Sequence, residues 1–241
     1  MARLKEYNGH YCESEYEYAF IGFLEAEGWK YSSGNNIHRV TKRDVLIADD
    51  FKKFIADTNL DLTEDEVIQI YDNVRLVGAE SDFATLHKVY GWMVNGVQFT
   101  TQDGLPRMIP LIDFDNWDKN IFRVVNQFTV EYTNNGQKEN RRPDVLLFVN
   151  GIPLCVIELK NPADANATIY DAWEQINIRY WRDIPHLLHY CPLACISDGV
   201  KTRLGTVRTP YEHFYAWRRV NEGDAVSTLP FAETETMIKG V

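Results

Sequence analysis

Residues 141–160 read Arg-Arg-Pro-Asp-Val-Leu-Leu-Phe-Val-Asn-Gly-Ile-Pro-Leu-Cys-Val-Ile-Glu-Leu-Lys. Two apolar runs are joined by Asn150-Gly151, a strong signal for a turn between antiparallel strands. Asp144 precedes the first run, and Glu158 and Lys160 end the second. Because alternate residues of a strand point to one face, Glu158 and Lys160 should lie together. The stretch predicts hairpin strands over 144–149 and 153–159, with two carboxylates and an ammonium group at one end.

The register of this hairpin decides whether the two carboxylates meet. A two-residue turn that pairs Val149 with Ile152 would place Asp144 opposite Ile157 and put Glu158 on the other face. A three-residue loop over 149–151, with Gly151 in the left-handed conformation of a bulge, would bring the carboxylates to one face. We therefore expect the bulged loop. The alternative is an ordinary buried hairpin whose terminal charges are solvated.

Two converging carboxylates suit a hard divalent cation. Mg²⁺ is normally held by one or two carboxylates together with phosphate oxygens and water. The sequence thus predicts a Mg²⁺ site, which Mn²⁺ could also occupy, with Asp144 and Glu158 as metal ligands. Lys160 would orient the attacking water or help to deprotonate it. This is the layout of a metal-dependent nuclease site.

The amino-acid sequence, within the hairpin and beyond it, resembles that of the endonuclease domain at the N-terminus of the restriction (motor) subunit of type I restriction-modification enzymes. The resemblance covers residues 109–219 specifically and residues 40–95 weakly. It rests on residues 141–162, on Leu111-Ile-Asp-Phe-Asp-Asn116 with Asn120, Phe122, Val124, Asn126, Gln127 and Phe128, on Cys195-Ile-Ser-Asp-Gly-Val200 with Arg203, Gly205 and Trp217, and on Glu13 to Trp29.

The resemblance implies a PD-(D/E)xK endonuclease that cuts double-stranded DNA. It also implies partners, namely the specificity and methylation subunits of the type I complex, and an ATP-driven motor. The chain contains no Gly-x-x-x-x-Gly-Lys-[Ser/Thr] phosphate loop, so ATP would act only through a missing motor domain. Two alternatives stay open: a repair exonuclease or junction resolvase of the same fold, and a catalytically silent docking module.

Two further catalytic candidates come from the resemblance. Glu17 aligns with the glutamate that joins the metal shell from the first helix, although acidic residues there also favour a helix N-terminus. The family pattern Gln-x-x-x-Tyr appears here as Gln175-Ile-Asn-Ile-Arg-Tyr180, one residue longer. In a regular helix an i, i+5 pair lies ~140° apart, so Arg179 would share the face of Gln175. A π-bulge would restore Tyr180 to that face. Tyr180 could also belong to the core.

Charge is unevenly distributed along the chain. The net charge is -10. Residues 137–219 carry 11 Lys and Arg against 9 Asp and Glu, and the remainder carries 14 against 26. The candidate phosphate contacts therefore lie in the motif half: Lys138, Arg141, Arg142, Lys160, Arg179, Arg182, Lys201 and Arg203. Arg141, Arg142, Arg179 and Tyr180 are our DNA-binding candidates, and the acidic remainder predicts weak DNA affinity for this chain alone.

The coarse organisation predicts an α/β fold, a mixed sheet flanked by helices, with helices at 13–27 and 168–181. Further strands are expected at 97–101, 122–132, 193–197 and 206–208. The division into domains assigns a helical accessory insertion to about 44–94, with a capping box at Thr63 and Glu66, a catalytic core to about 109–219, and the start of a connector to 228–241.

The 241 residues, 45% of them apolar, suffice for a sizeable core, and no apolar stretch approaches the length of a membrane span. We therefore expect a cytoplasmic protein without membrane contact. The four cysteines predict reduced thiols, with a zinc site at Cys191 and Cys195 as the alternative.

Overall fold

The computed structural model describes residues 13–77, 80–161, 168–226 and 232–240. The helices are α1 Glu13–Ala26, α2 Ala48–Thr58, α3 Glu64–Arg75, α4 Asp82–Asn95, α5 Ile169–Glu174, α6 Trp181–Asp183, α7 Pro185–Leu188 and α8 Ala232–Gly240, with a π-helix Gln175–Tyr180 between α5 and α6 and 3₁₀ turns at Gly34–Asn36, Trp117–Lys119 and Tyr211–His213. The strands are β1 Lys30–Ser33, β2 Val97–Thr100, β3 Pro106–Ile109, β4 Phe122–Asn126, β5 Val130–Asn134, β6 Gln137–Arg141, β7 Val145–Val149, β8 Ile152–Leu159, β9 Leu193–Ser197, β10 Thr202–Thr206 and β11 Tyr215–Ala216.

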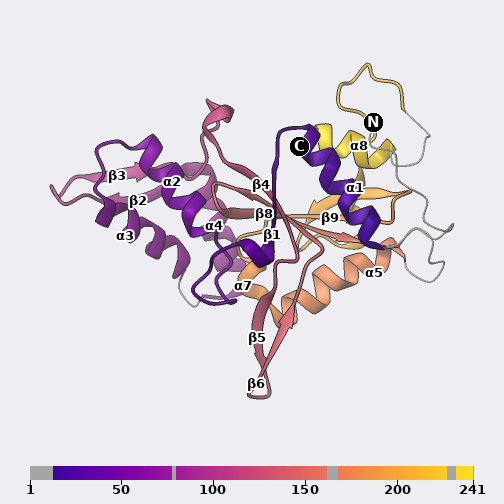
Figure 1. Cartoon of the computed structure of the whole chain (residues 1–241), viewed down its shortest axis with the longest axis horizontal. Helices are drawn as coiled ribbons and strands as arrows, with labels where there is room; N and C mark the ends of the chain where they lie inside the picture. Colours follow the sequence, from indigo (N-terminus) through magenta and orange to yellow (C-terminus); the bar gives the residue numbers. More distant parts are fainter. Residues whose placement is uncertain (1–12, 78–79, 162–167, 227–231, 241) are drawn as a thin grey trace.

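A mixed sheet of seven strands forms the centre, in the order β1-β4-β7-β8-β9-β10-β11 (Figure 1). The pairs β1–β4 and β8–β9 are parallel and the other pairs are antiparallel. Strands β7 and β8 lie at the middle and are apolar except for Glu158, because helices cover both of their faces. This confirms the predicted fold class, a mixed α/β sheet flanked by helices.

Each face of the central sheet is covered by its own apolar cluster. On one face, Phe20 and Leu24 of α1 and Met237 of α8 pack against Val145 and Ile157. On the other face, α5 and the π-helix pack against Val156 and Leu146, in a cluster that continues into α2, α3 and α4. The alternation of β7 and β8 therefore assigns each of their residues to one of two environments.

The helix expected at 13–27 is confirmed as α1, and it ends where the sequence indicates. Gly28 has φ 98°, and the amide of Trp29 donates to the carbonyl of Leu24 at 3.1 Å, so the chain leaves the helix through a Schellman turn. The capping box is also confirmed, since Thr63 accepts from the amide of Glu66 and the Glu66 carboxylate accepts from the amide of Thr63. The acidic stretch 44–94 contains α2, α3 and most of α4.

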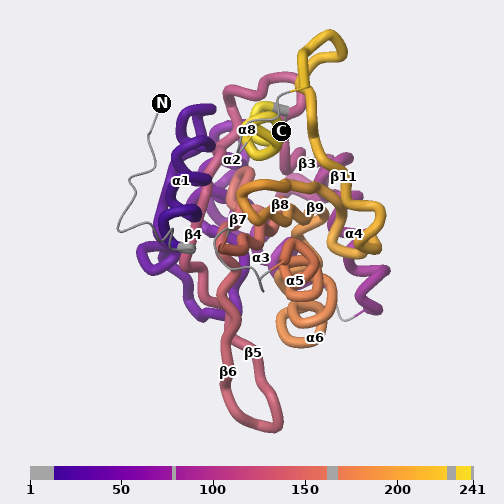
Figure 2. The backbone as a smooth tube through the Cα atoms, turned by 90° about the vertical axis from the view of Figure 1, so that its right-hand side faces the viewer, coloured from indigo at the N-terminus to yellow at the C-terminus, as the bar shows by residue number. Residues whose placement is uncertain are grey.

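Two predicted strands were wrong. The strand expected over 122–132 is divided into β4 and β5, because Gln127 adopts a left-handed backbone conformation with φ 56° that turns the chain out of the central sheet. The strand expected at 206–208 lies instead at 202–206, where β10 pairs with β9. Strand β5 pairs with β6 through an Asn135-Gly136 turn, and this hairpin projects from the body of the molecule (Figure 2).

The expected connector over 228–241 falls partly outside the described residues, and within it α8 is described. Thr234 of α8 joins a buried row of hydroxyls that includes Thr202, Ser197 and Tyr16, with neighbouring oxygens 2.6–2.7 Å apart. These hydroxyls satisfy one another within the apolar face formed by α1 and α8. Of the helices described, none has the length and apolar character needed to cross a membrane.

The four cysteines fall into two groups. Cys12 lies outside the described residues. Cys155, Cys191 and Cys195 are buried and free, as the sequence predicts for reduced thiols. Burial raises the pKa of the Cys155 thiol to about 12, so this group stays protonated at neutral pH.

Candidate active site

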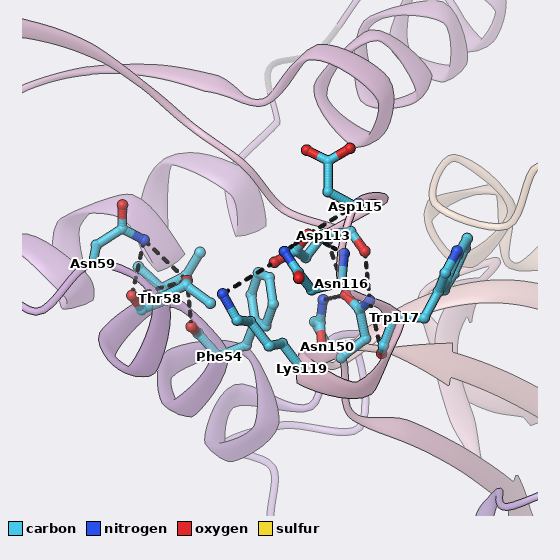
Figure 3. Close-up of polar contacts among 11 residues, drawn as sticks. Phe54, Thr58, Asn59, Asp113, Asp115, Asn116, Trp117, Lys119 and Asn150 are labelled. Atoms are coloured by element: carbon cyan, nitrogen blue, oxygen red, sulfur yellow. Dashed lines mark hydrogen bonds and ion pairs between the residues drawn. The ribbon is translucent and has the colours of Figure 1, made fainter.

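The turn of the β7–β8 hairpin differs from the bulged loop that we expected. Val149 pairs with Ile152, so Asn150 and Gly151 form a two-residue turn, with φ 52° and 75°. Asn150 is fixed from outside the hairpin: its side chain accepts from the amide of Ile121 at 2.7 Å and donates to the Leu111 carbonyl at 2.9 Å. Figure 3 places Asn150 next to the loop that carries Asp113 and Asn116. These contacts hold Asn150, which is not a glycine, in the left-handed region.

A bulge further along the hairpin restores the register. Phe148 pairs with Pro153, whereas Leu147 pairs with Cys155, so Leu154 has no partner on β7. Proline lacks an amide hydrogen and cannot complete the ladder, which makes this a favourable place for an irregularity. Val145 then pairs with Ile157, and the next step outward places Asp144 opposite Glu158. The predicted meeting of the carboxylates is thus correct, but the bulge that permits it lies in β8 rather than in the turn.

Each acidic residue is held by a defined contact. The Asp144 carboxylate accepts from the backbone amide of Leu159 at 2.8 Å. Glu158 is fully buried, and its two oxygens accept from the Tyr180 hydroxyl at 2.6 Å and from Gln175 Nε2 at 2.5 Å. Burial first, and then the charge of Asp144, raise the pKa of Glu158 well above its ordinary value. The Tyr180 hydrogen bond and the charge of Lys160 oppose this rise.

Lys160 is oriented toward the same group of side chains. It follows Glu158 by two residues, and its Nζ donates to Gln175 Oε1 at 3.1 Å. Its backbone amide donates to the Ser197 carbonyl of β9 at 2.8 Å, which extends the parallel pairing of β8 and β9 by one residue. Gln175 therefore bridges Glu158 and Lys160 with the two ends of its amide.

Of the two arrangements that the sequence left open for the helix after the lysine, the structure has the π-bulge. Residues Gln175–Tyr180 form a π-helix, and Gln175 Nε2 lies 2.9 Å from the Tyr180 hydroxyl. The extra residue is absorbed by the wider turn, so Tyr180 shares the face of Gln175, and Arg179 is left exposed. Tyr180 is also part of the core, with 1% of its surface exposed. Its ring packs in the apolar cluster, and its hydroxyl contacts the polar groups of the site. Burial and the charge of Glu158 raise the pKa of this hydroxyl well above its usual range.

Glu17 lies at a neighbouring strand end but on the α1 face. Its carboxylate accepts from Asn126 Nδ2 at 2.6 Å, and Asn126 Oδ1 accepts from the Tyr31 hydroxyl at 3.0 Å. Asn126 pairs with Val145, one residue from Asp144, and is in phase with Val124, which packs against α1. Sequence reasoning missed a specific role for Asn126, although an amide at the end of an apolar strand is a signal for a buried polar partner.

The basic candidates divide into paired and unpaired groups. Arg141 forms an ion pair at 2.7 Å with Asp183, whose side chain is 5% exposed, and Arg182 reaches the same carboxylate. Arg203 lies over the ring of Tyr211. Arg142 and Arg179 are exposed, and within the described part of the chain neither has a carboxylate at ion-pair distance. The structure thus brings together Asp144, Glu158, Lys160, Gln175 and Tyr180, with Arg142 and Arg179 beside them.

Comparisons with known proteins agree with this arrangement. Residues 11–213 match the family model "Type I restriction enzyme R protein N terminus". The chain is 34% identical over 223 residues to the putative type I restriction enzyme MjaIXP endonuclease subunit of Methanocaldococcus jannaschii, covering 88% of this chain and 21% of that protein. It is 30% identical over 244 residues to the type I restriction enzyme HindI endonuclease subunit of Haemophilus influenzae, covering 95% and 22%.

The chain spans about a fifth of the length of these two relatives. The family match, however, covers most of the chain and includes both carboxylates, the lysine and the π-helix. The chain therefore belongs to the family of N-terminal domains of type I restriction enzyme R proteins, and its relatives are endonuclease subunits.

Proposed function

We propose that this chain is a Mg²⁺-dependent endonuclease domain that hydrolyses phosphodiester bonds of double-stranded DNA. The observation that carries the proposal is that Asp144, just before β7, lies close enough to Glu158 of β8 for its charge to raise the pKa of Glu158, while Lys160 contacts Gln175, which also holds Glu158. The names of the relatives support the reaction class. By the same similarity, we propose that ATP-driven translocation belongs to a separate motor domain and that specificity and methylation subunits are partners.

The donor set fits a hard divalent cation. Asp144 and Glu158 offer carboxylate oxygens, and their mutual repulsion would be relieved by a cation between them. Within the described residues no group of three His, Cys, Asp or Glu side chains completes a ligand set, so water and phosphate oxygens would supply the other ligands. Asp144 and Glu158 would hold such an ion, which would supply polarisation of the phosphate and a lowered pKa of bound water. Mn²⁺ would fit the same oxygens.

The remaining side chains position the reacting groups. Gln175 and Tyr180 fix the Glu158 carboxylate by donating to both of its oxygens, so this ligand is held before substrate arrives. Lys160, held by Gln175, is placed to orient the attacking water or to stabilise the negative charge that develops on the phosphate. By the family similarity, Glu17 is also proposed as an outer contributor to the metal shell; its carboxylate accepts from Asn126 Nδ2 on the α1 face of the sheet.

Metal binding tests the proposal directly. Crystals of the chain soaked with Mn²⁺ are expected to show an ion between Asp144 and Glu158, with oxygen ligands at about the 2.0–2.1 Å typical of Mg²⁺ or slightly longer. Asp144→Asn keeps the size of the side chain but removes its charge, and should abolish the ion. Saturating Mn²⁺ that leaves the two carboxylates without an ion would rule out the proposed centre.

The π-helix provides a second test. Tyr180→Phe removes the hydroxyl that donates to Glu158, and a hydrogen bond to a charged group contributes about 1.5–3 kcal/mol. If this energy is expressed in the transition state, cleavage by the full-length enzyme should fall by roughly 10- to 100-fold. Tyr190→Phe is the matched control, because Tyr190 is also buried and donates to the Val74 carbonyl at 2.6 Å, away from the site. Equal loss of cleavage in both variants would mean that Tyr180 acts only through stability.

A further inference from the structure

A polar hollow of about 220 Å³ adjoins the carboxylate cluster. It is lined by Asn140, Arg141, Arg142, Gln175, Arg179 and Tyr180. Gln175 and Tyr180 are the residues that also hold Glu158, so they form a wall between the hollow and the carboxylates. An anion bound in the hollow would therefore lie next to the proposed reaction centre. It would not contact the carboxylates of Asp144 and Glu158, which we propose as the metal ligands.

The charge of the hollow comes from two arginines. Arg141 is engaged by Asp183 at 2.7 Å and contributes to the frame of the hollow. Arg142 and Arg179 are exposed and have no ion-pair partner among the described residues. The carboxylate of Asp171 influences Arg179 only through its charge, because Thr168 holds it with a backbone amide and a hydroxyl, both at 2.7 Å. Two guanidinium groups thus remain available to an anion.

The chemistry and size of the hollow select a phosphodiester. Guanidinium groups bind tetrahedral oxyanions through paired N–H donors, and the amides of Asn140 and Gln175 can add neutral donors. A volume of 220 Å³ is too small for a base pair and is about seven times the volume of a water molecule in the liquid, enough for one phosphate with part of its sugar.

We propose that this hollow binds one phosphate of the DNA backbone, a subsite beside the scissile position, and that Arg142 and Arg179 neutralise it together. The proposal deepens the proposed nuclease function and rests on it for the identity of the ligand. The β5–β6 hairpin, which projects from the body of the molecule in Figure 2, borders the subsite, since Asn140 and Arg141 end β6. DNA bound at the subsite would therefore lie beside the hairpin. Lys138 on that hairpin is 85% exposed and lies 3.9 Å from the Glu131 carboxylate.

The test measures binding of a short fluorescent DNA duplex to the chain by anisotropy in EDTA, over a range of salt concentrations. A protein that loses one phosphate contact loses about one unit of the slope of log affinity against log salt. Arg142→Gln and Arg179→Gln should each lower the slope by about one. The double variant should also lower it by about one, because both arginines serve the same phosphate. Arg179→Lys should retain the slope and weaken affinity, because the charge remains while the forked donors are lost.

Lys53→Gln is the matched control, since it removes one exposed positive charge from α2, and it should leave the slope unchanged. The proposal is overturned if the arginine variants behave like Lys53→Gln, if the slope losses of the two arginines add in the double variant, or if the wild-type chain does not bind the duplex at low salt. Binding in EDTA requires neither metal nor cleavage. A chain that binds no Mn²⁺ yet shows the expected slopes would refute the nuclease proposal and leave the phosphate subsite standing.

Discussion

Asp144→Ala, Glu158→Ala and Lys160→Ala are each expected to lower DNA cleavage by the full-length enzyme by about a thousandfold or more. Loss of a metal ligand, or of the lysine cation that stabilises the developing charge, raises the activation free energy by several kcal/mol. An increase of about 4 kcal/mol corresponds to a thousandfold decrease in rate. ATP hydrolysis and DNA binding should stay nearly unchanged, because we assign both mainly to parts of the protein outside this site. Cleavage of plasmid DNA and release of phosphate from ATP measure the two activities.

Lys53→Ala serves as the control for the lysine. Lys53 is exposed on α2, where its Nζ pairs with Asp57 at 2.6 Å, so its removal changes the charge of the chain without touching Gln175. It should cleave DNA at close to the wild-type rate. If Asp144→Ala or Lys160→Ala lost ATP hydrolysis together with cleavage, these residues would instead serve folding or docking, and the catalytic assignment would fail.

Gly151→Ala is expected to lower the free energy of unfolding by about 3 kcal/mol or more. A Cβ at Gly151 would lie 2.2 Å from the Ile47 carbonyl oxygen and 2.8 Å from the Phe51 amide nitrogen. These atoms belong to the start of α2, and the amide of Ile47 donates to the Gly151 carbonyl at 2.8 Å, so the turn cannot move away without breaking this contact. Denaturant unfolding measures the loss.

Gly136→Ala separates backbone strain from the clash. Gly136 occupies the same position in the Asn135-Gly136 turn of the β5–β6 hairpin, with φ 79° against 75° for Gly151. A Cβ added to Gly136 would have no atom within 4 Å. It should therefore cost only the left-handed conformation, about 1–2 kcal/mol. Similar losses for the two alanines would show that α2 can adjust, and that the hairpin is not anchored through Gly151.

The register of the β7–β8 hairpin illustrates how far the sequence could be interpreted. The requirement that Asp144 and Glu158 share a face was enough to predict one extra residue in the hairpin, which we expected in the turn over 149–151 and which lies in β8. It could not locate that residue, because the turn is fixed by Asn120 and Ile121, which come from a different part of the chain. Pro153 was the local signal, since a residue without an amide hydrogen favours the irregularity beside it.

The same limit explains the divided strand and the π-helix. The break at Gln127 depends on Phe128, whose ring is buried in the core beneath the guanidinium group of Arg39. Arg39 is distant from Phe128 in the sequence, so local sequence patterns do not predict this contact. The π-helix could be predicted as one of two outcomes from the spacing of Gln175 and Tyr180. The choice between them was made by tertiary structure, because the Tyr180 hydroxyl gains Glu158 as a partner only in the bulged form.

The π-helix also changes what counts as the same site in different sequences. Six residues from Gln175 to Tyr180 place the amide and the hydroxyl on one face, a task that five residues accomplish in an ordinary helix. Spacing in the sequence is therefore free to vary by one while the angular phase of the two side chains is preserved. A search for such sites that fixes the number of intervening residues would discard this chain, whereas one that fixes the phase about the helix axis would retain it.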